Sequence, residues 1–325
     1  MKPVLAGLDI GGTKCAVVVG IEGLQGIQII AKQSFPTPDT PEKALTKMMD
    51  ELEKILFMEE DLVLAAIGIS CGGPLDSKKG LILSPPNLPN WDRIDVLTPL
   101  RDRFQVPVSV QNDANACALA EWKWGAGIGT SNMVFLTFGT GMGAGFILDG
   151  RLYTGTNDMA GEVGHVRLEQ GGPIGYGKAG SFEGFCSGGG IARLAQMMVN
   201  EWFNQGKTTE ICSSREEITE ISAKTIADAA NAGDDLANQI YQVVGQKLGR
   251  GLALLIDMLN PEKIIIGSIY SRQEALLKPI VMEELRKEAL PFSVEVCEVV
   301  PSGLKESVGD LASLSVAKYA LELEG

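Results

Sequence analysis

The sequence lacks several features that would place it in other classes of protein. It has no apolar run of roughly eighteen residues, so we expect no membrane-spanning helix. Met1-Lys2-Pro3-Val4 runs directly into a strand-like stretch and does not have the form of a signal peptide. Lys and Arg form no cluster, and 28 basic against 41 acidic residues give a net charge of −13, which argues against a nucleic-acid partner.

Closely spaced cysteine pairs are also absent, and there is only one histidine, His165. Scattered cysteines indicate free thiols in a reducing compartment rather than a disulfide framework. The six are Cys15, Cys71, Cys117, Cys186, Cys212 and Cys297. A cytoplasmic enzyme or a binder of small ligands remains, and 325 residues favour two domains.

The stretch Val108–Asn115 joins a β-branched run to a helix rich in Ala and Leu. Asn112 or Asp113 is the helix N-cap in the simpler interpretation. In the alternative, the strand delivers Asp113 to the carboxyl edge of a sheet, where open α/β sheets bind ligands. The sequence around this stretch leaves both interpretations open.

Two glycine turns, each between two strand patterns, suggest that the chain repeats one plan. Strands at Val4–Ile10 and Cys15–Gly20 flank Asp9-Ile10-Gly11-Gly12-Thr13-Lys14, and a third strand is predicted over Gln25–Phe35. Strands at Met133–Phe138 and Phe146–Leu148 flank a second run, Gly139–Gly145. One such turn is weak evidence, but a matched pair suits phosphate binding by backbone N–H groups. Later strands are predicted at Lys263–Ile266 and Val294–Val299.

Five motifs in order make the chain resemble the ROK family of sugar kinases and repressors. They are Asp9–Lys14, Asn112-Asp113-Ala114-Asn115, Gly139-Thr140-Gly141-Met142-Gly143, Gly161-Glu162-Val163-Gly164-His165 and Ile266-Gly267-Ser268. The resemblance implies an α/β, duplicated ribonuclease-H-like fold of the actin, hexokinase and Hsp70 type, with two domains and an interdomain cleft. We expect a smaller domain over 1–116, a larger one over 117–308, and a C-terminal helix, about 309–325, packed back on the first.

By the same resemblance the protein phosphorylates a hexose with ATP, at the hydroxyl on carbon 6, and Asp113 is the general base. Asp9 is expected to hold Mg²⁺ through water. The implied sugar contacts are Gly73, Asn87, Asn112, Asp113, Glu162, His165 and Glu183. The implied ATP contacts are Asp9, Gly11, Gly12, Thr13, Lys14, Thr140, Gly141, Gly267 and Ser268.

The chain departs from the family at the zinc site. The family pattern C-x-C-G-x-x-G-C-x-E, aligned on Gly177, Gly180 and Glu183, places Ile174, Tyr176 and Ser181 at the three cysteine positions. A single histidine, His165, cannot form a tetrahedral zinc site. We therefore predict a member without zinc, in which the sugar contact of His165 is less secure.

Two alternatives to an active kinase remain. The family's repressors carry an N-terminal helix-turn-helix, for which a first strand at Val4 leaves no room, and the chain is acidic. The other alternative is a non-catalytic sugar sensor that keeps the pocket. Glucose is the default substrate, and a homodimer is expected from the family resemblance; the sequence does not choose among hexoses.

Overall fold

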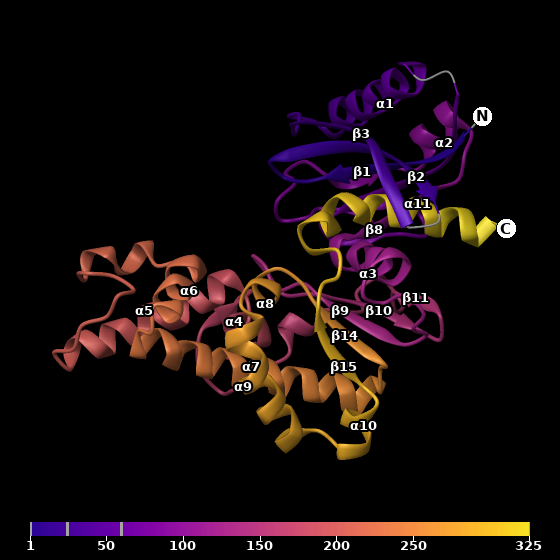
Figure 1. Cartoon of the computed structure of the whole chain (residues 1–325). Helices are drawn as coiled ribbons and strands as arrows, with labels where there is room; N and C mark the ends of the chain where they lie inside the picture. The colour runs from indigo at the N-terminus through magenta and orange to yellow at the C-terminus, as the bar shows by residue number, and fades with distance from the viewer. Residues whose placement is uncertain (1, 24–25, 59–60, 325) are drawn as a thin grey trace. The chain divides into compact units, whose positions relative to one another are not determined.

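The computed structural model describes residues 2–23, 26–58 and 61–324 (Figure 1). Residue 25 of the third predicted strand and residue 325 of the predicted last helix lie outside them. The strands are β1 (Lys2–Ile10), β2 (Lys14–Gly23), β3 (Gly26–Pro36), β4 (Leu62–Cys71), β5 (Leu75–Asp76), β6 (Leu81–Leu83), β7 (Asp92–Asp95), β8 (Val108–Asn112), β9 (Met133–Leu136), β10 (Ala144–Leu148), β11 (Arg151–Tyr153), β12 (Ile174–Gly175), β13 (Lys178–Ala179), β14 (Lys263–Ile266) and β15 (Glu298–Pro301).

Helices connect and cover these strands. The α-helices are α1 (Pro41–Met58), α2 (Thr98–Phe104), α3 (Asp113–Trp124), α4 (Phe182–Phe185), α5 (Gly188–Asn204), α6 (Ala223–Asn231), α7 (Asp235–Leu259), α8 (Ile269–Arg272), α9 (Glu274–Glu288), α10 (Pro291–Glu295) and α11 (Val308–Glu324). Three short 3₁₀ turns are η1 (Val163–His165), η2 (Glu216–Glu220) and η3 (Lys305–Ser307). Within the described residues, no helix is both long and apolar enough to cross a membrane.

The first sheet has the strand order β3-β2-β1-β4-β8. β1, β2 and β3 form an antiparallel meander, whereas β4 and β8 run parallel to β1. Buried β-branched and aliphatic residues fill the strand centres, as in Val17, Val19 and Ile67. Because three strands are parallel, their carboxyl ends meet at one edge: Ile10 pairs with Cys71, and Cys71 pairs with Asn112.

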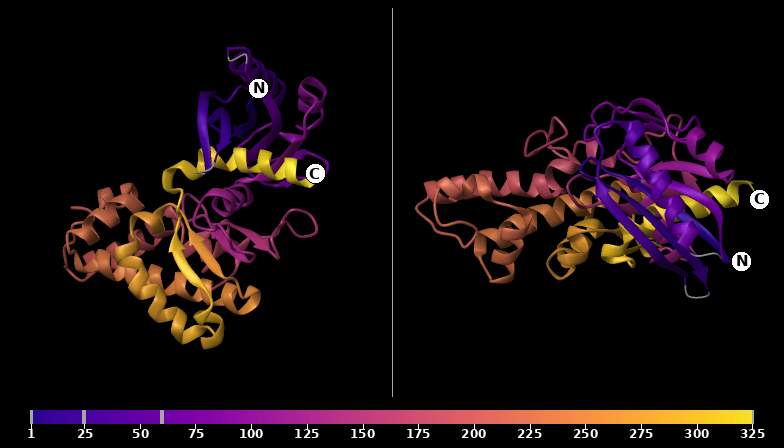
Figure 2. Two further views of the ribbon diagram at one scale, coloured as in Figure 1. Left: turned by 45° about the vertical axis from the view of Figure 1, so that its right-hand side comes forward. Right: turned by 90° about the horizontal axis from the view of Figure 1, so that it is seen from above.

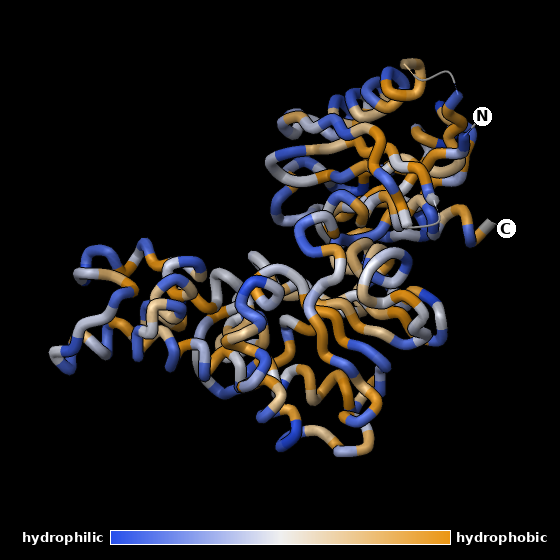
Figure 3. The backbone as a smooth tube through the Cα atoms, in the orientation of Figure 1, coloured by the Kyte–Doolittle hydropathy of each residue, from blue (hydrophilic) through white to orange (hydrophobic). Residues whose placement is uncertain are grey.

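The second sheet has the order β11-β10-β9-β14-β15, so the same arrangement occurs twice in the chain. Its strands β9 and β14 read as almost continuous apolar runs (Figure 3), as expected of parallel strands covered on both faces. The repeat confirms the duplicated α/β fold predicted from the two glycine turns.

The strand predicted at Val294–Val299 is only partly correct. Pro291 instead begins the short helix α10, which ends at Glu295, and β15 starts at Glu298. Proline fixes the backbone at the first helical position, and this local preference prevails over the β-branched residue Val294.

Grouping of contacts divides the chain into two compact units. Unit 1 contains the described residues of 1–131, 145–160 and 303–325, and unit 2 contains 132–144 and 161–302. The domain limits predicted from the sequence, 1–116 and 117–308, remain a proposal.

In unit 1 the helix α11 lies across the first sheet (Figures 1 and 2) and contacts β1, β4 and α3. Glycines make this approach possible. A Cβ atom on Gly68 would lie 2.1 Å from the backbone N of Ala317, and one on Gly7 would lie 2.2 Å from Ser313 Oγ. The helix backbone therefore rests almost directly on the backbone of the sheet.

In unit 2 the longest helix, α7, packs against α9 and α5. Its apolar stripe buries Ile240, Val244 and Leu248. Asp234 caps the helix start by accepting a hydrogen bond from Ala237 N, and Asn260 ends it in the left-handed conformation.

Candidate active site

A cavity of about 350 Å³ lies in unit 1 at the edge where β1, β4 and β8 end. This is the place where open α/β sheets bind ligands. Its lining consists of Asp9, Ile10, Gly11, Gly12, Ser70, Gly72, Gly73, Pro85, Pro86, Asn87, Leu88, Asp113, Cys117, Gly309 and Ala312. The cavity therefore combines carboxylates, small residues and a proline-stiffened loop.

Asp113 is the first residue of α3, and the preceding residue caps the helix. Asn112 Oδ1 accepts a hydrogen bond of 2.8 Å from Asn115 N, so the carboxylate of Asp113 is not used as the cap. Ser70 Oγ donates a hydrogen bond of 3.2 Å to Asp113 Oδ1. Each interpretation of this stretch is thus partly correct: Asn112 is the helix cap, and Asp113 lines the cavity.

Electrostatics in this cavity disfavour negative charge. Asp113 is exposed as a whole residue, but the protein atoms around its carboxyl group partly desolvate it and raise its pKa, an effect that the Ser70 hydrogen bond partly opposes. Desolvation and repulsion from Asp113 raise the pKa of Asp9 to about 6, although Lys14 acts in the opposite direction. Two acids at one edge therefore form a site that a cation or a proton would stabilise.

The first glycine turn is shaped by close backbone contacts. Gly11 N donates to Lys14 O at 3.1 Å, and Thr37 Oγ1 donates to Gly11 O at 2.6 Å. A Cβ atom on Gly12 would lie 2.2 Å from Asn87 O, so the turn and the proline loop touch through backbone alone. Thr13 and Lys14 belong to this turn but do not line the cavity.

In unit 2 the second glycine turn is tied to an acid from α4. Met142 N donates a hydrogen bond of 3.1 Å to Glu183 Oε2. A Cβ atom on Gly164 would lie 2.2 Å from Met142 O, which brings the Gly161–His165 motif against the same turn. Glu183 and that motif are therefore neighbours in unit 2; the sugar-binding role that the family resemblance implies for them stays a prediction.

Other predicted residues of unit 2 adjoin this turn. Gly188 N donates to Gly139 O at 2.7 Å, and Ser268, which has φ of 52°, lies 3.5 Å from the position of a Cβ on Gly139. Thr140 and Gly141 lie within the turn itself, and Gly267 N donates to Leu136 O at 3.0 Å. The two predicted nucleotide motifs of unit 2 are thus side by side.

Glu162 precedes the 3₁₀ turn η1 and His165 is its last residue, and both are exposed. The pKa of Glu162 is raised by partial burial of its carboxyl group and by repulsion from Glu183, and it is lowered by His165. The imidazole of His165 makes an edge contact with Tyr176 at 6.4 Å between ring centroids. Lys178 Nζ donates to the backbone oxygen of His165 at 2.7 Å.

The segment that would contain the family's zinc cysteines is held here by hydrogen bonds. Ser181 caps α4 by accepting from Gly184 N, and Arg167 Nη1 donates to Ala179 O at 2.8 Å. Ile174 and Tyr176 lie on the small hairpin of β12 and β13. Across the described ranges, no three His, Cys, Asp or Glu side chains gather in a way that could hold a metal ion.

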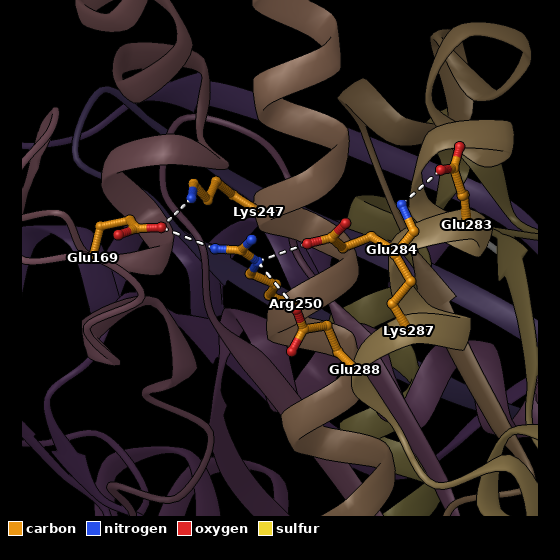
Figure 4. Close-up of polar contacts among 7 residues, drawn as sticks. All are labelled: Glu169, Lys247, Arg250, Glu283, Glu284, Lys287 and Glu288. Atoms are coloured by element: carbon orange, nitrogen blue, oxygen red, sulfur yellow. Dashed lines mark hydrogen bonds and ion pairs between the residues drawn. The ribbon is translucent and has the colours of Figure 1, made fainter.

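Charged contacts join the same segment to two long helices (Figure 4). Glu169 Oε1 pairs with Lys247 and, at 2.9 Å, with Arg250 Nη1, both on α7. Arg250 Nε in turn pairs with Glu284 on α9 at 2.7 Å and with Glu288 at 3.6 Å. The loop after His165 is therefore fixed to α7 and α9 by shared ion pairs.

Sequence reasoning did not assign nine lining residues of the unit 1 cavity to the site: Ile10, Ser70, Gly72, Pro85, Pro86, Leu88, Cys117, Gly309 and Ala312. Ser70 is the penultimate residue of β4 and pairs in register with Gln111, so the parallel pairing of β4 with β8 was the signal that could have identified it. Gly309 and Ala312 enter only because α11 returns to the first sheet. Asn112, in contrast, was predicted but lies beside the cavity lining rather than in it.

Comparison with known proteins gives one consistent family. The model of the ROK family matches residues 5–319. A glucokinase of Halalkalibacterium halodurans is 35% identical over 88% of this chain and 86% of that protein. The crystal structure of a ROK family glucokinase from Streptomyces griseus, in complex with glucose and AMPPNP, is 28% identical and superposes with a TM-score of 0.73 over 97% of this chain and 99% of that one. The transcriptional regulator NagC of Escherichia coli K12 is 27% identical over 81% of this chain and 63% of the regulator.

Proposed function

This chain belongs to the ROK family, and from that premise we propose that it transfers the γ-phosphoryl group of ATP to the 6-hydroxyl of a hexose, with Asp113 as the general base. The comparisons support the general part of this function: the chain has the actin and hexokinase type of fold and is an ATP-dependent sugar kinase. Glucose is the substrate that we propose first, because it is the sugar in the related complex.

The observation that carries the proposal is the position of Asp113. Its carboxylate lines a cavity at the carboxyl edge of three parallel strands, in the same lining as the glycine turn Gly11-Gly12. A phosphoryl-transfer enzyme works mainly by alignment and charge stabilisation, and a carboxylate near the nucleophile accepts its proton. The raised pKa of Asp113 suits it to that transfer, because a base with a higher pKa holds a proton more readily.

The acidic edge of the cavity also fits a magnesium ion. Mg²⁺ usually keeps several waters and takes only one or two carboxylates together with substrate phosphates. Asp9 meets this description, since desolvation and the nearby Asp113 leave its negative charge poorly compensated. We propose that Asp9 holds the ion through water; when bound with ATP, Mg²⁺ neutralises charge on the triphosphate.

The remaining contacts divide by chemistry. Backbone N–H groups of glycine turns bind phosphate oxygens. We assign this role to Gly11, Gly12, Thr13 and Lys14 in unit 1 and to Thr140 and Gly141 in unit 2, with Gly267 and Ser268 at the adenosine. Carboxylates and amides exchange hydrogen bonds with adjacent hydroxyls. The sugar contacts that we propose on this ground are Gly73, Asn87, Asn112, Glu162, His165 and Glu183.

Asp113→Asn is the direct test. The amide keeps the shape of the side chain but cannot accept the proton, so kcat falls by about 10²- to 10⁴-fold while the KM for the sugar changes much less. ADP release is measured with a panel of hexoses and amino sugars. Asp102→Asn, an exposed acid on α2 outside the cavity lining, is the matched control and keeps full turnover. Equal rates for the Asp113 variant and the wild type would refute the assignment.

A sugar sensor without turnover is the second candidate, and similarity to the regulator NagC is the observation in its favour. The same panel separates the two. If wild-type protein binds a hexose in calorimetry but releases no ADP with any sugar of the panel, the protein is a sensor. Sugar-dependent ADP release establishes the kinase.

A further inference from the structure

Unit 1 contains a second cavity, of about 300 Å³, that shares no lining residue with the cavity of Asp113. Five parts of unit 1 line it: the turn between β5 and β6, the start and body of the helix α2, the strand β8, the strand β11 with the residue after it, and the end of α11. Three residues of β8 line this cavity, Val108 at the start of the strand and then Ser109 and Gln111, whose side chains share one face because strand residues alternate.

The side chain of Gln111 has unused hydrogen-bonding capacity here. It is only 4% exposed, and its Oε1 accepts a hydrogen bond of 3.1 Å from Asn115 Nδ2. Its Nε2 donates to no group in the described part of the chain. This nitrogen is not one of the fully buried unpartnered atoms of the described residues, so it is accessible from the cavity that Gln111 lines. A ligand in the cavity would supply the missing acceptor.

The charge of the lining is opposite to the charge of the whole protein. Lys78 and Arg101 line the cavity, and among the side chains that the structure describes no carboxylate does, in a chain whose net charge is −13. The ammonium of Lys78 makes no ion pair with the described residues. The guanidinium of Arg101 donates through Nη2 to Val108 O at 2.9 Å and has further N–H groups.

Two carboxylates that adjoin residues of the lining already accept hydrogen bonds from the protein. Asp158 accepts hydrogen bonds of 2.8 Å from both the N and the Oγ of Ser77. Asp95, beside Arg101, accepts from Leu97 N and Thr98 N at 3.0 Å. Arg101 interacts electrostatically with Asp95, so of the two cations Lys78 is the one without an ion pair among the described residues.

From these contacts we propose that the second cavity binds a small hydroxylated oxyanion, of which a phosphorylated sugar is the representative. The cations and Gln111 Nε2 recognise the oxyanion, since charge-assisted hydrogen bonds to phosphate are stronger than those between neutral groups. The hydroxyl groups of Ser109, Thr154 and Tyr319 serve the ligand's hydroxyls, and Leu97, Leu152 and Leu323 form its apolar wall. Binding there does not depend on turnover at Asp113.

Calorimetry with the full chain tests the site, with glucose 6-phosphate and inorganic phosphate as separate probes. The variants Lys78→Met and Arg101→Met each keep the aliphatic stem but remove a cation. We expect each to weaken binding of glucose 6-phosphate by about 10-fold or more, as the loss of a charged hydrogen bond predicts. Lys79→Met is the matched control, because Lys79 pairs with Asp76 at 2.8 Å and does not line the cavity.

Gln111→Met, of similar volume, removes the buried donor and is expected to weaken binding as well. Thermal melting of each variant shows whether it is folded, and the exposed positions of Lys78 and Arg101 make loss of the fold an unexpected result. If neither glucose 6-phosphate nor inorganic phosphate binds at about 10 mM, the proposal is overturned. So would wild-type affinity in both Lys78→Met and Arg101→Met, since the anion would then occupy another site.

Discussion

Asp113 is subject to two opposing influences at the level of a single residue. The protein atoms that surround the carboxyl group in the cavity lining partly desolvate it and raise its pKa, while the hydroxyl of Ser70 stabilises the charged form and lowers the pKa. The first influence is the larger. The residue therefore behaves as a stronger base than a free aspartate, but Ser70 keeps it ionised over a wider pH range than burial alone would allow.

The pH dependence of kcat/KM follows from this balance. Only the deprotonated carboxylate accepts a proton, so activity is lost as the pH falls through the pKa of Asp113, which lies above the ordinary value of 3.8. Ser70→Ala removes the interaction that lowers this pKa and shifts the acid limb to higher pH. We expect to see the shift in profiles of kcat/KM from about pH 4 to about pH 9, which report the free enzyme. The exposed Ser84→Ala is the control, and identical acid limbs for Ser70→Ala and wild type would contradict the explanation.

Single residues also show where prediction from sequence succeeds in the site. Asp9, Gly11, Gly12 and Asp113 lie within a few residues of a predicted strand end, and the structure places all four in the lining of one cavity. Ser70 could not be identified in this way, because its bond to Asp113 depends on the register of β4 against β8. Register is set by the packing of whole strands, and a short sequence pattern does not contain it.

At the level of secondary-structure elements, the contact between α11 and the first sheet depends on glycine. Gly68 lies under the helix where Ala317 N and Ser313 O come within 2.1 and 2.2 Å of any added Cβ atom. Both of these neighbours are backbone atoms of a helix and cannot move independently. The helix can keep its position only if the residue at 68 has no side chain.

Gly68→Ala is therefore expected to destabilise the protein by about 1–3 kcal/mol, as overpacking of a close contact does. Denaturation by urea, followed by circular dichroism, measures the change. Gly171→Ala is the control, because a Cβ atom there meets nothing within 4 Å and its φ is not positive. A Gly68 variant as stable as the Gly171 variant would show that α11 can shift away from the sheet.

Glu169 joins the loop after His165 to α7 through Lys247 and Arg250 (Figure 4). It is partly exposed, and exposed ion pairs contribute little to global stability. We expect Glu169→Gln to leave the melting temperature almost unchanged but to loosen the loop that presents Glu162 and His165. Its KM for the sugar should rise several-fold with kcat nearly constant, as when binding is lost equally in the ground and transition states.

A matched comparison for Glu169→Gln is Glu283→Gln on α9. Glu283 pairs with Lys287 at 2.6 Å on the exposed face of the helix and does not contact the loop. Steady-state kinetics at low and high salt should show a KM effect for the Glu169 variant alone, and high salt should reduce the difference from wild type. If both variants have wild-type KM values, the ion pairs of Glu169 do not position the loop.

For the whole molecule, the metal content is a distinctive expectation. With Ile174, Tyr176 and Ser181 at the family's cysteine positions, we predict that the purified protein carries no stoichiometric zinc. Elemental analysis measures this directly. Treatment with a chelator, followed by Mg²⁺ alone, is expected to restore full activity, whereas a relative that retains the three cysteines would also need zinc. One zinc per chain, or recovery only after zinc is added, would disprove the prediction.

The architecture as a whole was predictable because it is repeated. Two glycine turns, at Gly11-Gly12 and Gly139–Gly145, each sit between strands, and the structure shows one strand order twice. The short helix α10, which starts at Pro291, was not predicted, since proline there begins a helix instead of ending one. The close seating of α11 on Gly7 and Gly68 could not be foreseen either, because it depends on which distant segments meet.

That seating has a consequence for how the protein is made. The sheet of β1, β2 and β4 leaves the ribosome early, but residues 308–324, which cover Gly7 and Gly68, are translated only after the whole of unit 2. At about 5–20 residues per second, the bare face of that sheet waits roughly 12–50 s for its helix. During this interval the first sheet of the nascent chain has been synthesised but lacks the helix that covers one of its faces. Chaperones therefore have an apolar surface to shield.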